Sequence, residues 1–233
     1  MAAWLAALAL AGSKAFAADP WGGALTLTTD YIFRGVSQSN GNPAAQVDLH
    51  ARSPAGWFAG AWSSTANPPP SYAGSPEVDL YAGFGRPLSD RWVATLSVVR
   101  YLYPNASPSS HYDASELSGT LRFDDWLALS AAVSPDARRY SVQGWSARGE
   151  TRSCEASLRQ PVFGAVSIVA ALGYYDTQAL LGESYRAWDG GLTTHAGPVE
   201  LALLRFGVDA AARRLFGSDA ADGHWVLTAT WRF

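Results

Sequence analysis

Along most of the chain, apolar and polar residues alternate with a period of two, the pattern of β-strands whose two faces see different surroundings. Between residues 44 and 53, for example, Val47 and Leu49 alternate with Asp48 and His50. Helical periodicity is nearly absent, and only Asp209–Phe216 has the pattern of a short helix. The alternation predicts about twelve strands, at Ala24–Gly35, Ala44–Ser53, Gly56–Ser64, Pro76–Gly85, Arg91–Tyr103, His111–Phe123, Trp126–Ser134, Thr151–Gln160, Phe163–Tyr175, Tyr185–His195, Pro198–Val208 and His224–Phe233.

The connections between these strands alternate in length. Connections after odd-numbered strands are long, as at residues 65–75 and 135–150, whereas those after even-numbered strands are short, as at residues 53–56 and 124–125. A meander of antiparallel strands places all odd connections at one end, and short turns opposite longer loops are typical of outer-membrane barrels. The sequence therefore predicts an all-β protein: a transmembrane antiparallel up-and-down β-barrel of about 12 strands, of the outer-membrane type.

In such a barrel the apolar face of each strand contacts lipid and the polar face lines the lumen. A charged lining would form a constriction that selects small polar or ionic solutes, or a network of ion pairs that plugs or stiffens the barrel. The mixed signs argue against strong selectivity for either charge. Candidate lining and constriction residues are Asp30, Arg34, Asp48, His50, Arg52, Glu77, Asp79, Tyr81, Glu116, Arg122 and Arg232.

Aromatic residues cluster near the ends of the predicted strands, where transmembrane barrels carry interfacial girdles. The chain also ends in the alternating stretch WVLTATWRF, and a final Phe is the signature that the outer-membrane barrel assembly machinery recognises. Arg91–Tyr103 and Phe163–Tyr175 have apolar residues on both faces, which predicts that part of the lumen is packed. The girdle candidates are Tyr31, Phe33, Trp57, Trp92, Trp126, Trp225, Trp231 and Phe233.

Composition and the first residues indicate an exported protein. Only 16% of residues are charged and 12% are aromatic, which suits strands that separate two solvents. An apolar run at residues 2–11 and the pattern Ala15-Phe16-Ala17 predict a cleaved signal peptide at residues 1–17. Residues 18–233 would then form the barrel, exported through the Sec pathway to the outer membrane of a Gram-negative bacterium. No apolar run is long enough for a transmembrane helix.

Other chemistry finds little support in the sequence. Four scattered histidines and the single Cys154 lack metal-ligand spacing, so we expect no metal and no cofactor. No serine is paired with a histidine and an acid in a recognisable arrangement, so we do not expect an enzyme. A net charge of −3 without a basic face argues against a nucleic-acid partner. The arginine pairs at 138–139 and 213–214 either contact lipopolysaccharide phosphates or are solvated charges.

Two stretches carry a family resemblance. LTTDYIFRGVSQSNGNPAAQ (Leu27–Gln46) and EVDLYAGF (Glu77–Phe84) resemble the TorF-type porin family, formerly a conserved proteobacterial family of unknown function. The resemblance implies a signal peptide, an outer-membrane barrel and a channel role, without catalytic residues or an agreed substrate. We therefore expect a porin-like channel for passive diffusion of small polar or ionic solutes. The alternatives are a plugged structural or ligand-binding barrel that acts through its extracellular loops, and an outer-membrane hydrolase.

Overall fold

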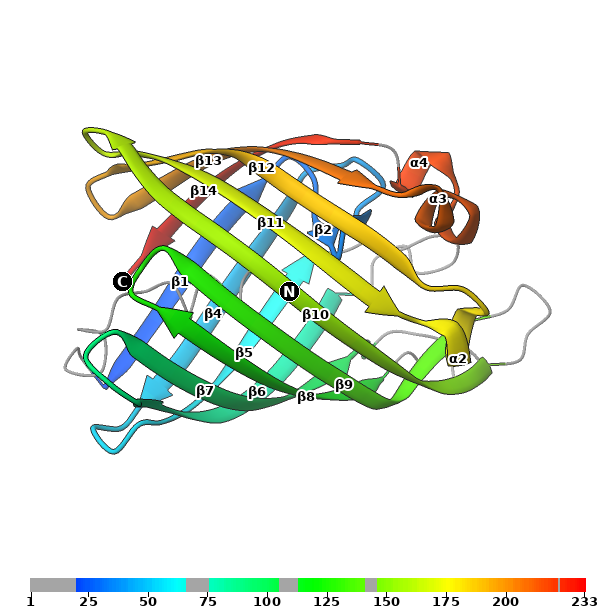
Figure 1. Cartoon of the computed structure of the whole chain (residues 1–233), viewed down its shortest axis with the longest axis horizontal. Coiled ribbons are helices and arrows are strands. Elements are labelled where there is room, and N and C mark those ends of the chain that lie inside the picture. Colours follow the sequence, from blue (N-terminus) through cyan, green and yellow to red (C-terminus); the bar gives the residue numbers. More distant parts are fainter. Residues whose placement is uncertain (1–19, 66–75, 105–112, 141–145, 222) are drawn as a thin grey trace.

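The computed structural model describes residues 20–65, 76–104, 113–140, 146–221 and 223–233; the predicted signal peptide and His111 lie outside them. Twelve strands of this part close into an antiparallel barrel (Figure 1). The prediction of fold class and strand number is therefore confirmed. The barrel strands are β1 (Trp21–Thr28), β4 (Ala44–Arg52), β5 (Trp57–Thr65), β6 (Pro76–Pro87), β7 (Trp92–Leu102), β8 (Ala114–Phe123), β9 (Leu127–Tyr140), β10 (Ser146–Phe163), β11 (Val166–Asp176), β12 (Tyr185–Ala196), β13 (Val199–Val208) and β14 (Trp225–Arg232).

The first and last barrel strands close the sheet. β1 pairs with β14 over a register that runs from Ala24 opposite Arg232 to Thr28 opposite Thr228. The closure continues past the strand, where the backbones of Gly23 and Phe233 exchange hydrogen bonds of 2.9 and 3.1 Å. Because an unpaired backbone group in lipid costs several kcal/mol, a closed sheet without edges is the form in which strands cross a bilayer.

The two ends of the barrel differ. Short turns at residues 53–56, 88–91, 124–126, 164–165 and 197–198 lie at the end where the chain finishes, which we call the short-turn end (Figure 1). The opposite end carries the helices α2 (Gln178–Leu181), α3 (Ala210–Phe216) and α4 (Ser218–Ala221). The short helix expected at 209–216 is thus present as α3, and Asp209 caps it by accepting from the amide of Ala212 at 3.0 Å. In the described ranges, no helix is long and apolar enough to cross a membrane.

The connection predicted at residues 135–150 is mostly strand, which corrects the expectation of a very long loop. β9 and β10 remain paired as far as Tyr140 opposite Ser146, so Arg138 lies in a strand. The helix α2 packs against this extended hairpin, and a Cβ on Gly149 would lie 3.0 Å from the α2 backbone. Glycine at this position therefore allows the close approach of α2.

The outer face of the barrel is apolar and the inner face is polar. In β1, Leu25 and Leu27 are exposed on the outside, whereas Thr26 and Thr28 are buried inside, as the alternation predicts. The same alternation recurs around the barrel, and aliphatic side chains exposed outside are Leu49, Leu80, Leu96, Val98, Leu117, Leu129, Leu158, Ile168, Leu172, Leu192, Leu203 and Leu227. Exposing such an apolar surface to water would be energetically unfavourable, whereas contact with lipid would be favourable.

Residues 29–43 leave the wall and fold into the barrel; we call this segment the inner hairpin. The predicted first strand, Ala24–Gly35, ends instead at Thr28, and the short strands β2 (Ile32–Phe33) and β3 (Val36–Ser37) form a separate two-stranded sheet (Figure 1). The turn between them places Arg34 at φ 52° and Gly35 at φ 79°. Two successive residues in the left-handed region reverse the chain tightly, as in a two-residue hairpin loop.

Candidate functional site

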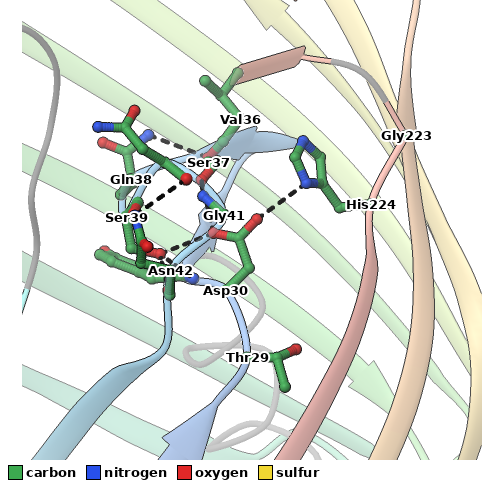
Figure 2. Close-up of polar contacts among 12 residues, drawn as sticks. Thr29, Asp30, Val36, Ser37, Gln38, Ser39, Gly41, Asn42, Gly223 and His224 are labelled. Carbon is green, nitrogen blue, oxygen red and sulfur yellow. Dashed lines mark hydrogen bonds and ion pairs between the residues drawn. The ribbon is translucent and has the colours of Figure 1, made fainter. Parts of the chain in front are cut away.

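The base of the inner hairpin is organised around one buried carboxylate, Asp30 (Figure 2). The hydroxyls of Ser37 and Ser39 donate to Asp30 Oδ1 at 2.6 and 2.8 Å. On the other side, His224 Nδ1 lies 3.1 Å from Asp30 Oδ2. Since His224 directly precedes β14, Asp30 holds the hairpin both to its own returning strand and to the barrel wall.

The tip of the inner hairpin reaches across the barrel through Arg34. Arg34 Nη2 donates to Glu116 Oε2 at 2.6 Å, on β8, and to Ser153 Oγ at 3.2 Å, on β10. Its guanidinium also lies over the rings of Phe33 and Tyr175, at 4.9 and 5.4 Å from the ring centroids. A single cation therefore ties the hairpin to three strands of the far wall.

Tyr31 and Phe33 lie inside the barrel, which corrects their assignment to the membrane girdle. Tyr31 is buried, donates to Glu77 Oε2 at 3.0 Å and contacts the ring of Trp62 at 5.5 Å between centroids. Phe33 packs edge-on against Tyr101 at 6.3 Å. The physical reason is the turn inward after Thr28, since a residue on the inner hairpin no longer follows the inside–outside alternation of the wall.

A packed cluster surrounds the hairpin at this level, as the two-sided apolar pattern of residues 91–103 indicated. Val99 and Tyr101 point inward from β7, while Leu96 and Val98 are exposed on the outer face. The buried members of the cluster are Tyr31, Ala44, Trp62, Tyr81, Val99 and Tyr101. The inner hairpin therefore packs against a hydrophobic cluster on the inner face of the barrel.

Asp48, His50 and Tyr81 form a second polar group. Asp48 accepts from Tyr81 at 2.6 Å through one carboxylate oxygen, and His50 Nδ1 lies 2.5 Å from the other. The hydroxyl of this group belongs to Tyr81 and bonds to the acid rather than to the histidine. The Asp48 carboxylate therefore bridges the tyrosine hydroxyl and the imidazole.

The remaining lining candidates lie at different depths of the barrel. Asp79 and Arg122 are buried on the inner face, and Arg52 shares a face with Asp48 and His50. Arg232 lies at the short-turn end, where it contacts Glu200 at 3.3 Å. The structure thus joins Asp30, Arg34, Glu77 and Glu116 through the inner hairpin and leaves Arg232 in a separate group. That these residues line a conducting path stays a prediction.

Sequence reasoning missed several lumen residues. Arg159, His195 and Glu200 meet near Arg232, with Arg159 Nη1 and His195 Nε2 at 3.3 and 3.2 Å from Glu200 Oε2. A signal for two of them was present, because His195 and Glu200 flank the short turn at 197–198 and are partners in the β12–β13 register. Trp62 was missed too, although its register partner on β4 is Asp48.

The other girdle candidates differ in exposure. Trp57, Trp126, Trp231 and Phe233 are exposed near the short-turn end, and Trp225 is exposed at the opposite end. Trp92 is half-buried and packs on Phe123 at 4.8 Å between ring centroids. A role for these rings at the lipid interface stays a prediction. Within the described residues, no three His, Cys, Asp or Glu side chains gather as metal ligands would.

A family model described as "Bacterial protein of unknown function (Gcw_chp)" matches residues 15–232. The chain belongs to this family. The match places the barrel in the Gcw_chp family without assigning it an activity, and the name TorF-type stays a prediction. Among curated proteins, none matches the chain.

Three solved structures that resemble this Gcw_chp barrel are two porins and a channel. The KdgM porin is 8% identical with a TM-score of 0.55, covering 91% of this chain and 99% of its own. The NanC porin is 13% identical with a TM-score of 0.54, covering 91% and 97%. An outer-membrane channel from Pseudomonas putida F1 is 9% identical with a TM-score of 0.56, covering 91% and 94%. At these identities the likeness shows the fold alone, that of outer-membrane barrels.

Proposed function

We propose that this Gcw_chp protein is an outer-membrane porin-like channel for passive diffusion of small polar or ionic solutes. The observation that carries the proposal is a closed twelve-stranded barrel with a charged and hydroxylated inner face. Eight strands leave an interior that side chains fill, and sixteen leave an aqueous channel, so twelve is a size at which side chains narrow a path. The porins and the channel that share the fold support the same reading.

The inner hairpin supplies the constriction in this proposal. It is fixed at its base by Asp30, along its length by Tyr31 and at its tip by Arg34, and these contacts reach the residue before β14, β6 and β8. Solutes would pass beside it, close to the carboxylates and hydroxyls that hold it. A narrow polar path of this kind would favour small hydrophilic solutes.

The location and partners follow from the same reasoning. The apolar outer face would contact outer-membrane lipid. As a TorF-type protein, the chain would be exported through the Sec pathway. The barrel assembly machinery would then recognise its C-terminal segment, which ends in Phe233. Arg213 and Arg214 lie on α3, at the end expected to face the cell exterior. There they would contact lipopolysaccharide phosphates, although Arg214 is also paired with Glu183.

The inner hairpin also favours a second candidate, a plugged structural or ligand-binding barrel that acts through its extracellular loops. Arg34 is held against the far wall of the barrel by a buried ion pair, and Tyr31 of the hairpin packs into the aromatic cluster on the inner face. In this case the lumen would brace the barrel, and the loops would carry the function.

Single-channel conductance of the refolded protein in a planar bilayer separates the two candidates. The channel gives discrete current steps, and the same sample unfolded by boiling before addition gives none. Retarded gel mobility after boiling serves as the check that the unboiled sample was folded. Folded protein that yields no steps at any voltage would overturn the channel and favour the plugged barrel.

A further inference from the structure

The charges on the inner face are segregated along the barrel axis. Arginines gather toward the short-turn end: Arg52 and Arg232 end β4 and β14, Arg122 is next to last in β8, and Arg159 lies near the end of β10. Acidic side chains on the same inner face lie nearer the other end, at Glu77, Asp79, Glu116, Glu155 and Asp189. Inner-face arginines are therefore concentrated at the short-turn mouth and carboxylates toward the other, with Glu200 and Arg34 as exceptions.

The short-turn mouth contains a group in which two arginines contact one glutamate. Arg159 Nη1 and Arg232 Nη2 each lie 3.3 Å from Glu200, on different carboxylate oxygens. Two guanidinium groups therefore share the carboxylate of a single side chain. Arg159 Nη2 also contacts His195 Nε2 at 3.0 Å.

The geometry of these contacts leaves donors for a ligand. A guanidinium carries five N–H groups in a planar fork and binds a carboxylate best through two parallel hydrogen bonds. Glu200 takes only one nitrogen from each arginine. Both arginines are only partly buried, with side-chain exposures of 20% for Arg159 and 39% for Arg232, so the group is open to solvent at the mouth.

We propose that Arg159 and Arg232 form an anion-binding subsite at the short-turn mouth, and that its ligands are small carboxylates. Glu200 holds the two guanidinium groups at a fixed spacing and competes with the ligand for them. His195 lies beside the subsite and adds to its positive charge when protonated. The proposal rests on the proposed channel only for the passage of the ligand, because binding itself requires only the folded barrel.

Equilibrium binding tests the subsite directly. Succinate is titrated calorimetrically into the refolded protein in a zwitterionic detergent at low ionic strength. We expect saturable binding that weakens as salt is raised, and the double variant Arg159→Gln/Arg232→Gln should bind at least about tenfold more weakly, since it loses two charge-assisted contacts. Arg91→Gln is the matched control, because Arg91 is an exposed turn arginine at the same end, paired with Asp124.

Glu200→Gln separates a binding role from a structural one. Removing the competing carboxylate should strengthen succinate binding, whereas a purely structural network would only be destabilised by the same change. Equal binding by wild type and the double variant, or weaker binding by Glu200→Gln at unchanged gel mobility, would overturn the subsite. Binding with no conductance would retain the subsite and reject the channel, whereas conductance without succinate binding would do the reverse.

Discussion

Arg34 Nη2 and Glu116 Oε2 lie 2.6 Å apart, joining the tip of the inner hairpin to the strand β8 of the barrel wall. Both side chains are largely buried, and Ser153 supplies a further acceptor for the guanidinium. Removing one partner of a buried ion pair leaves the other charge without compensation, which costs far more than the loss of a surface pair. The position of the hairpin therefore depends on this contact.

Replacing Arg34 by Ala should release the tip of the hairpin and widen the lumen. We expect a larger single-channel conductance, more frequent current fluctuations and a loss of about 3 kcal/mol in the free energy of unfolding. Arg91→Ala is the control, since it removes an exposed arginine of the same net charge. Identical conductance in wild type and Arg34→Ala would mean that the hairpin does not narrow the path.

Gly35 is confined by the wall as well as by its own backbone. A Cβ there would lie 2.5 Å from Ala187 Cβ and 2.7 Å from Val208 Cγ1, whereas a Cβ on Gly41 would meet nothing within 4 Å. Both glycines have a positive φ, so Gly41→Ala should cost about 1 kcal/mol in unfolding free energy for the backbone alone. Gly35→Ala should cost about 1–3 kcal/mol more, because it adds the packing clash. Denaturant titration of both variants in detergent measures the difference, and equal losses would contradict the packing of the tip.

Leu96 lies in the middle of β7 and is exposed on the outer face. If that face contacts lipid, Leu96→Arg should destabilise the barrel in a bilayer by about 2–4 kcal/mol. Leu88→Arg is the control, because Leu88 is exposed to a similar extent but lies in a short turn outside the strands. The measurement is unfolding in lipid vesicles, and equal stability of the two variants would argue against a lipid-facing position for Leu96.

Deleting Phe233 distinguishes its recognition by the assembly machinery from its contribution to closure of the barrel. The backbone of Phe233 exchanges two hydrogen bonds with Gly23, so its loss should weaken folding in vesicles slightly. If the assembly machinery also reads this residue, the level of folded barrel in cells should fall much further than folding in vesicles does. Phe163→Ala, which removes an exposed aromatic from the last position of β10 at the same end of the barrel, is the control. Parallel losses in cells and in vesicles would leave recognition of Phe233 unsupported.

The barrel was predictable because lipid imposes its pattern on every strand that crosses it. An outward side chain must be apolar and the next one need not be, so the alternation in residues such as Val47 and Asp48 carries the strand assignment. The short turns were equally visible, since two antiparallel strands can be joined by a few residues. The bounds of most strands consequently agree with the structure to within a few residues.

The alternation did not predict the parts of the fold that do not contact lipid. The β9–β10 hairpin continues past Ser134, where the residues of both strands become polar and the apolar face disappears, so its pairing was read as a loop. For the inner hairpin the prediction was wrong for the opposite reason, because the alternation persists although the segment leaves the barrel wall. Tyr31 and Phe33 keep the alternation of β1, but the packing that decides their position comes from residues distant in sequence, such as Trp62 and Tyr101. A local pattern does not contain that information.

The contact between Asp30 and His224 has a consequence for the order of assembly. These residues follow the first barrel strand and precede the last, so they meet only when β14 has reached β1. In a chain that folds from its N-terminus, Asp30 would lack its partner His224 until the final segment is in place. Full attachment of the inner hairpin to the wall would therefore require a closed sheet. In a barrel arrested before that step, the hairpin would lack its contact with the wall through Asp30.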